Sequence, residues 1–151
     1  MATGTASKTS TGSTGGVVST LTNSDKQFFI SAAQMNMAEL ALSRIATDQA
    51  TNPDVRKLAA QMLADHQKID QELKEFALKK GVALPTPVTS ESLPNADLDH
   101  AYVLRMISDH RKAIDEFNAA ILTDPDLRGW AARTLPILRE HLAAAQKISG
   151  S

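Results

Sequence analysis

The sequence predicts an all-α protein that folds as an antiparallel four-helix bundle. Along four segments, apolar residues recur at alternating steps of three and four, which is the spacing of a helix with one buried face. Aromatic residues make up only 4% of the chain, whereas alanine and leucine are frequent. An Asx-Pro pair, a common helix start, occurs at Asn52-Pro53 and again at Asp124-Pro125. These features together favour two αα-hairpins.

Local signals place the ends of the expected helices. Thr22 and Asp25 have the spacing of a capping box, and Asn52 followed by Pro53 starts the second helix. The second helix should end at Gly81, after a last turn that contains two lysines. The expected helices cover residues 23–50, 53–80, 95–122 and 125–148.

The second half of the chain repeats the first. Residues 52–56 (NPDVR) match residues 124–128 (DPDLR), and an Ala-Ala pair follows in the same register in both halves. The segment 81–95 joins the two hairpins and contains three prolines, so it is neither helix nor strand. Fully extended, it reaches about 45 Å, which exceeds the ~40 Å length of a bundle helix. It can therefore cross the whole bundle or form a slack loop at one end.

Composition narrows the class of protein. The chain has 151 residues, a net charge of −1 and no cysteine, which excludes disulfides and thiolate chemistry and argues against nucleic acid as a partner. No apolar run is long enough to span a membrane. Residues 1–20 are rich in Ser, Thr and Gly and predict a disordered tail or linker, with the bundle domain at 21–149. The tail has no export signal as it stands, although such stretches commonly follow a removed one.

One metal-binding residue type interrupts the apolar face of each helix near its middle: Glu39, His66, His110 and His141. Glu39 lies 14 residues before Pro53 and His66 lies 13 after it. His110 lies 15 residues before Pro125 and His141 lies 16 after it. With a rise of about 1.5 Å per residue, the two members of each hairpin should differ in height by only about 1.5 Å. We therefore expect the four side chains to share one buried level, where they bind a metal or form a hydrogen-bonded polar network.

Three imidazoles and a carboxylate suit zinc, copper, iron or manganese. The chain lacks the Glu-x-x-His motifs of diiron bundles, which disfavours a carboxylate-bridged diiron site. Several neighbours are candidates for an additional ligand or for a hydrogen bond to a ligand. They are Asp70, Asp65, Asp109, Glu140, Met62 and Met106. Methionines at this spacing are more often core packing than ligands.

The combined motifs resemble an exported bacterial family, domain of unknown function 4142. The resemblance rests on residues 28–39, 52–56, 65–66, 79–85, 109–110, 134–136 and 140–141. It implies a ferritin-like four-helix bundle on secreted, periplasmic or outer-membrane-associated proteins, and it supplies no established activity. The connection between the second and third helices is shorter than the family pattern leads us to expect.

The sequence therefore supports three functions. The first is an exported bundle that binds zinc, copper or iron and serves metal handling or stress protection. The second is a metal-free structural or protein-interaction module. The third is a metal-dependent oxidase or peroxidase-like enzyme that uses the same site, which would also need an open coordination position and an access path. Beyond the metal ion, a homodimer is a candidate assembly.

Overall fold

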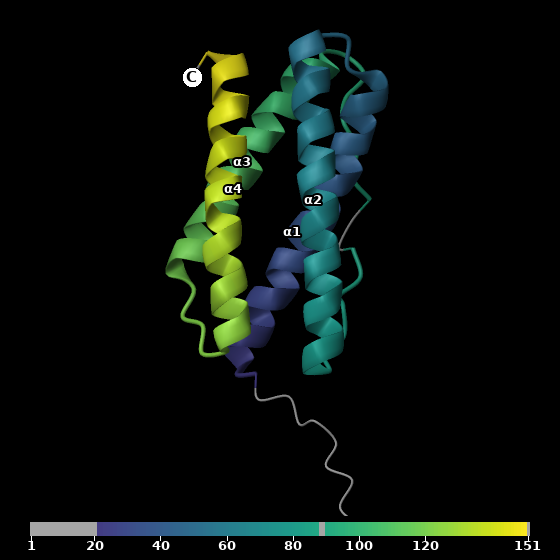
Figure 1. Cartoon of the computed structure of the whole chain (residues 1–151). Helices are drawn as coiled ribbons and strands as arrows, with labels where there is room; N and C mark the ends of the chain where they lie inside the picture. The colour runs from purple at the N-terminus through teal and green to yellow at the C-terminus, as the bar shows by residue number, and fades with distance from the viewer. Residues whose placement is uncertain (1–20, 88–89, 151) are drawn as a thin grey trace, which may run out of the picture.

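The structure, a computed structural model, describes residues 21–87 and 90–150. Its helices are α1 (Asn23–Gln49), α2 (Pro53–Lys80), α3 (Leu98–Ala119) and α4 (Pro125–Ser149), and the described residues contain no strand (Figure 1). The predicted fold class, an all-α four-helix bundle, is confirmed. The predicted disordered tail at 1–20 lies outside the described residues.

The helices pack as two antiparallel hairpins, α1 with α2 and α3 with α4, and the hairpins meet through α1 with α3 and α2 with α4 (Figure 1). The described parts of the connection, 81–87 and 90–97, run along the bundle from the end of α2 to the opposite end (Figure 1). Accordingly, α3 begins beside the α1–α2 turn. Of the two paths that the sequence left open, the chain takes the one that crosses the bundle.

The caps expected from the sequence form. Thr22 and Asp25 make a reciprocal capping box at the start of α1, with bonds of 3.1 and 3.2 Å. At the start of α2, Oδ1 of Asn52 accepts a hydrogen bond from the backbone of Asp54 (2.8 Å). Gly81 ends α2 with φ 65°, a left-handed conformation that a glycine adopts without strain.

The third helix is shorter than the predicted 95–122. It begins at Leu98 because Asp97 takes a left-handed conformation (φ 57°) that breaks the helical path. It ends at Ala119 because Ala120 is extended and leads the chain toward a contact between Thr123 and α1. A tertiary contact thus overrides the helical pattern that continues in the sequence to Leu122.

A pair of equivalent aspartates joins the two hairpins. Asp25, at the start of α1, accepts hydrogen bonds from the backbone N–H (2.9 Å) and hydroxyl (2.7 Å) of Thr123 in the α3–α4 turn. Asp99, at the start of α3, accepts from the backbone N–H (3.0 Å) and hydroxyl (2.9 Å) of Thr51 in the α1–α2 turn. The start of the first helix in each hairpin therefore bonds to the loop of the other hairpin. These contacts fix the two hairpins lengthwise at both ends of the bundle.

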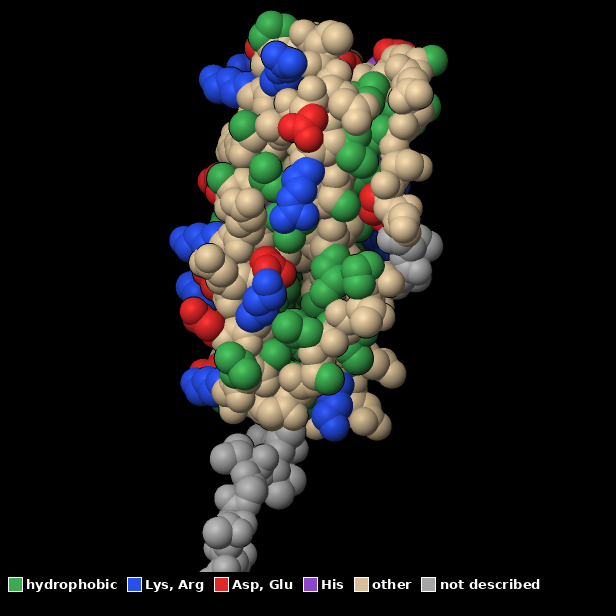
Figure 2. Space-filling view, turned by 90° about the vertical axis from the view of Figure 1, so that its right-hand side faces the viewer, with side chains coloured by type: hydrophobic (Ala, Val, Ile, Leu, Met, Phe, Trp, Pro, Cys, Tyr) green, Lys and Arg blue, Asp and Glu red, His purple; other side chains and the backbone are tan. Residues whose placement is uncertain are grey.

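The apolar core is divided in two. One cluster, around Leu42, Met62 and Tyr102, lies toward the α1–α2 turn, and the other, around Phe29 and Leu73, lies toward the opposite end. The polar residues predicted to face inward fall between the two clusters along each helix and are buried. None of the described helices combines the length and apolarity needed to cross a membrane. On the face shown in Figure 2, acidic and basic side chains are interspersed.

The two aspartates predict a matched pair of stability effects. Asp25 is fully buried, whereas the bonds of Asp99 are exposed to solvent. Losing hydrogen bonds to a buried charged group leaves unsatisfied donors, so Asp25→Ala should lower the free energy of unfolding by about 2–4 kcal/mol. Water can replace the partners of Asp99, and Asp99→Ala should cost only about 1 kcal/mol. Urea denaturation followed by circular dichroism measures both, and equal losses would contradict the role given to burial.

Candidate metal site

Three imidazoles converge in the layer between the two apolar clusters. His66 comes from α2, His110 from α3 and His141 from α4, and their exposed fractions are 3%, 2% and 0%. One ring nitrogen from each lies within 4.8 Å of the others, and the ring centroids are 5.2 to 5.6 Å apart. These histidines form the single metal-capable group of this kind within residues 21–87 and 90–150. We call them the histidine cluster.

The hydrogen on the His66 ring is positioned by Asn36 of α1. The amide Nδ2 of Asn36 donates to the backbone carbonyl of His66 (3.1 Å), which leaves its Oδ1 to face Nδ1 of the ring (2.8 Å). Because an amide oxygen only accepts, His66 Nδ1 carries the hydrogen and donates it. The other nitrogen, Nε2, then presents a lone pair to the cluster, and it has no hydrogen-bond partner among the described residues.

Acceptors fix the other two rings in the same way. Nδ1 of His110 donates to the backbone carbonyl of Met106 (2.9 Å). Nε2 of His141 donates to Oδ2 of Asp65 (2.7 Å), whose side chain is 40% exposed. Each histidine therefore points its N–H outward at an acceptor, and the inward atoms are Nε2 of His110 and Nδ1 of His141.

The inward nitrogens of His110 and His141 are 3.2 Å apart. If both rings are neutral with these outward bonds, both nitrogens carry lone pairs, and either a shared proton or a metal ion between them would remove the repulsion. Burial, with the nearby His110 and His141, holds the pKa of His66 well below its ordinary value of 6.5. Burial and His141 lower the pKa of His110 to about 4. At neutral pH these two rings are therefore uncharged, the form that binds metals.

Glu39 is buried, with 4% of its surface exposed, but its carboxyl group lies outside the histidine cluster. Neither of its oxygens has a hydrogen-bond partner of good geometry among the described residues. Burial, then the nearby charge of Asp109, raises the pKa of Glu39 well above its ordinary value of 4.5. The structure thus brings together three of the four residues expected to share a site. Asn36, one turn earlier on α1, takes the place beside His66 that we expected for Glu39.

The other candidate carboxylates differ in their surroundings. Asp65 bonds to His141, as described above. Asp109 pairs with Arg105 (2.8 Å) rather than with a histidine. Asp70 pairs with Lys74 (2.6 Å), and Glu140 is exposed. Of these carboxylates, Asp65 alone has a hydrogen bond to a histidine of the cluster.

The candidate methionines lie in the apolar core. Met62 and Met106 are both fully buried and belong to the cluster around Leu42 and Tyr102. This is the gap-filling role that the sequence favoured for them. Met106 also contributes to the site through its backbone carbonyl, which holds the ring of His110.

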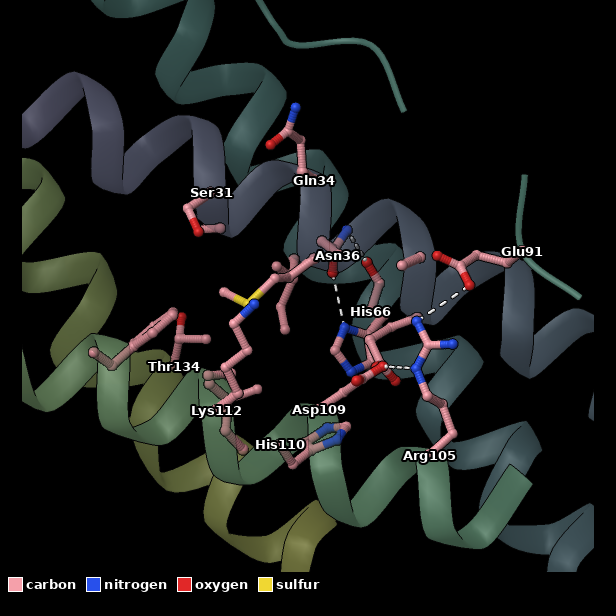
Figure 3. A pocket seen from close by; sticks show the side chains of 18 of the residues that line it. Ser31, Gln34, Asn36, His66, Glu91, Arg105, Asp109, His110, Lys112 and Thr134 are labelled. Carbon is pink, nitrogen blue, oxygen red and sulfur yellow. Dashed lines mark hydrogen bonds and ion pairs between the residues drawn. The ribbon is translucent and has the colours of Figure 1, made fainter. Parts of the chain in front are cut away.

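A pocket of about 290 Å³ leads from the surface between α1 and α3 to the histidine cluster. Asn36, Glu39, His66 and His110 line its inner part, whereas His141 is absent from its wall. Figure 3 shows Lys112 on α3 and Gln34 on α1 around the same pocket, together with Glu91 bonded to Arg105. The cluster is therefore closed on the side of His141 and accessible on the side of His66 and His110.

Sequence reasoning did not identify Asn36. The signal was present, because Asn36 precedes Glu39 by three residues and so lies on the same helical face.

The fold and the cluster define a class: an α-helical bundle of two hairpins with a histidine-lined polar centre. A family model described as "Domain of unknown function (DUF4142)" matches residues 12–148, and the chain belongs to this family, as the sequence motifs indicated. A solved structure titled "Crystal structure of DUF305 fragment from Deinococcus radiodurans" is similar, with a TM-score of 0.77 and 16% identity. The match covers 86% of this chain and 97% of that one, which shows a shared fold. Comparison with curated proteins finds no match.

Because the carboxyl group of Glu39 is buried, the free energy of unfolding should depend on pH differently in the wild type and in Glu39→Gln. Folding favours the protonated form of Glu39, so the stability that it contributes at low pH is lost as the pH rises above 4.5. Glu39→Gln cannot ionise and escapes this loss. In metal-free protein the variant should be the more stable by about 1–3 kcal/mol at pH 7, and the difference should shrink toward pH 4.5. Urea denaturation across this range tests it; a difference that is constant with pH would contradict a raised pKa.

In the same urea titrations, the pH dependence that arises from the histidines is common to the wild type and Glu39→Gln. His66 and His110 have lowered pKa values, so both proteins should lose stability as the pH falls from 6.5 toward about 4. This loss is common to the wild type and the variant. It cancels in their difference, which then reports Glu39 alone.

Proposed function

We propose that this bundle binds a transition-metal ion through His66, His110 and His141 and serves metal handling or protection against stress. One observation carries the proposal. Outward acceptors hold each of the three rings with its lone pair directed inward, and one ring nitrogen from each lies within 4.8 Å of the others. Burying three such groups without a partner is costly, and a metal ion satisfies all of them at once.

The donor set fits zinc, copper or iron. Neutral imidazole nitrogen binds all three metals, and a site with three protein ligands leaves room for one more. The bond from His141 to the carboxylate of Asp65 is the arrangement that orients and strengthens histidine ligands in many metal sites. The residues present therefore support a site with three histidine ligands, and the ion would supply a Lewis-acid or redox centre.

We further propose Glu39 as the fourth ligand. Its carboxyl group is buried on the accessible side of the cluster, lines the same pocket as His66, and has no competing hydrogen bond of good geometry there. A metal ion nearby would favour its ionised form, in the same way that metal binding releases protons from other ligands. Only a change of side-chain position is needed, because α1 already places Glu39 next to the pocket.

A metal-free module is the competing function. The 3.2 Å distance between His110 and His141 also suits a single proton shared between the two rings. In that case the centre is a polar network that specifies the packing of the helices, and the bundle serves structure or protein interaction. Oxidase or peroxidase-like activity would need the metal as well as the pocket. We also propose export to the periplasm or cell exterior, which the composition of residues 1–20 supports.

Metal titration separates the two functions. Tag-free protein, stripped with a chelator, should bind one Co(II) or Zn(II) ion per chain in calorimetry, with visible cobalt absorption from nitrogen coordination. His66→Ala and His110→Ala should each abolish this binding, because each removes one of three ligands.

The matched control is His100→Ala, since His100 is exposed on α3 and lies outside the cluster. Circular dichroism establishes that each variant is folded. Absence of binding in the wild type, or undiminished binding in His66→Ala, would leave the metal-free module as the function.

The hydrogen bond from His141 predicts a smaller, graded effect. Asp65→Asn keeps the size of the side chain but removes the charge that orients the ring, so metal affinity should fall by about 10- to 100-fold without loss of the site. Asp70→Asn is the control, because Asp70 lies on the same helix and pairs with Lys74 instead. Equal affinities for the two variants in competition with a chromophoric chelator would contradict the role of Asp65.

A further inference from the structure

The pocket between α1 and α3 has two chemically distinct parts. One part of its wall is apolar and includes Ile69, Phe117 and Trp130, whereas the charged side chains of Arg105, Asp109 and Lys112 line another part. Its inner end is polar and includes Glu39 and His66. An apolar wall beside convergent polar groups is a common feature of small-molecule sites.

Two buried groups at the inner end lack partners. Nε2 of His66 and both carboxyl oxygens of Glu39 have no hydrogen bond of good geometry among the described residues, and both side chains are more than nine-tenths buried. Such groups bind a molecule that satisfies them more strongly than one that only fills the space. A hydroxyl is suited to both, because it can donate to His66 Nε2 and can pair with Glu39 as donor or acceptor.

The aromatic residues of the wall indicate that the ligand with this hydroxyl contains an aromatic ring. Phe117 and Trp130 both line the pocket, with ring centroids 5.7 Å apart and planes inclined by 48°. Phe28 already packs against both rings, with centroids 4.9 Å from Phe117 and 6.3 Å from Trp130, so a ligand ring would contact the surfaces that Phe28 leaves free. The volume of about 290 Å³ is at the lower limit of small-molecule sites and accommodates one ring with a short substituent.

We propose that this pocket binds a single-ring hydroxyaromatic compound of the phenol class. Its ring lies against Phe117 and Trp130, and its hydroxyl reaches Glu39 and His66. The proposal goes beyond metal binding and does not require it, because the contacts that it uses belong to the protein alone. His66 and Glu39 are also the proposed metal ligands, so phenol and a metal ion should compete for them, and the phenol titration is made without metal.

The probe is phenol itself, with toluene as the analogue that lacks the hydroxyl. Phenol is titrated into the full chain in the presence of a chelator, and binding is followed by calorimetry and by ligand-observed NMR. We expect one saturable site per chain and an affinity for toluene that is weaker by about tenfold or more. Because Trp130 is the one tryptophan in the sequence, its fluorescence provides an independent local readout.

A pair of matched variants localises the binding. Ala113→Leu adds bulk to the pocket wall and should weaken phenol binding by at least about tenfold. Ala64→Leu makes the same change on the exposed face of α2 and should have no effect. The thermal unfolding transition shows that both variants are folded; Thr134→Leu, a second change in the pocket wall, takes the place of Ala113→Leu if that protein does not fold.

Three results would overturn the proposal. They are the absence of saturable phenol binding to the wild type, equal binding of phenol by the Ala113→Leu and Ala64→Leu variants, and equal affinity for toluene and phenol. Each is distinct from failure of the metal site, since these titrations contain no free metal. A protein that binds Co(II) but not phenol retains the proposed function and loses only this inference.

Discussion

The outward hydrogen bonds of the three buried imidazoles constrain the rest of this bundle. Each ring needs an acceptor behind it, and these acceptors come from three sources: an amide on α1, a backbone carbonyl on α3 and a carboxylate on α2. The bonds of His66 and His141 fix α1 against α2 and α2 against α4, whereas the acceptor of His110 lies on its own helix. Displacing α1 or α2 by one turn would bury a ring nitrogen without a partner, at a cost of about 1–3 kcal/mol for each such group.

The two aspartate contacts at the ends of the bundle keep the helices at the lengthwise positions that the histidines need. Asp25 holds the turn near Thr123, and Asp99 holds the turn near Thr51. A third link, from Lys80 at the end of α2 to Asp124 at the start of α4 (2.8 Å), strengthens one end. The helices are thus fixed lengthwise at their ends while their middle sections hold the polar layer. The division of the core into two apolar clusters follows from the same arrangement.

Much of this architecture could be predicted from the sequence because its signals are local. Asn52 with Pro53 and Asp124 with Pro125 mark helix starts, and counting residues from them gives the height of each buried polar group. Periodicity also places the three histidines on inward faces. It does not resolve which of two neighbours on one face makes a given contact. For this reason Glu39 is at the expected height but outside the cluster, and Asn36 holds His66 instead.

The second role of Asp25, as partner of Thr123, could not be predicted either. Its capping box accounts for the residue completely at the local level, and the contact joins positions 98 residues apart. The end of α3 at Ala119, before the predicted Leu122, is also explained by the contact between Thr123 and Asp25.

The histidine cluster draws its members unequally from the two repeats. His66 belongs to the first hairpin, and His110 and His141 belong to the second. Neither half of the duplication contains a complete donor set, so an ion held there would tie the halves together across their seam. The similar hairpins supply the scaffold, but the three histidines do not follow the repeat. A bound ion would then stabilise the contact between the two hairpins, and only a correctly assembled bundle could bind the ion.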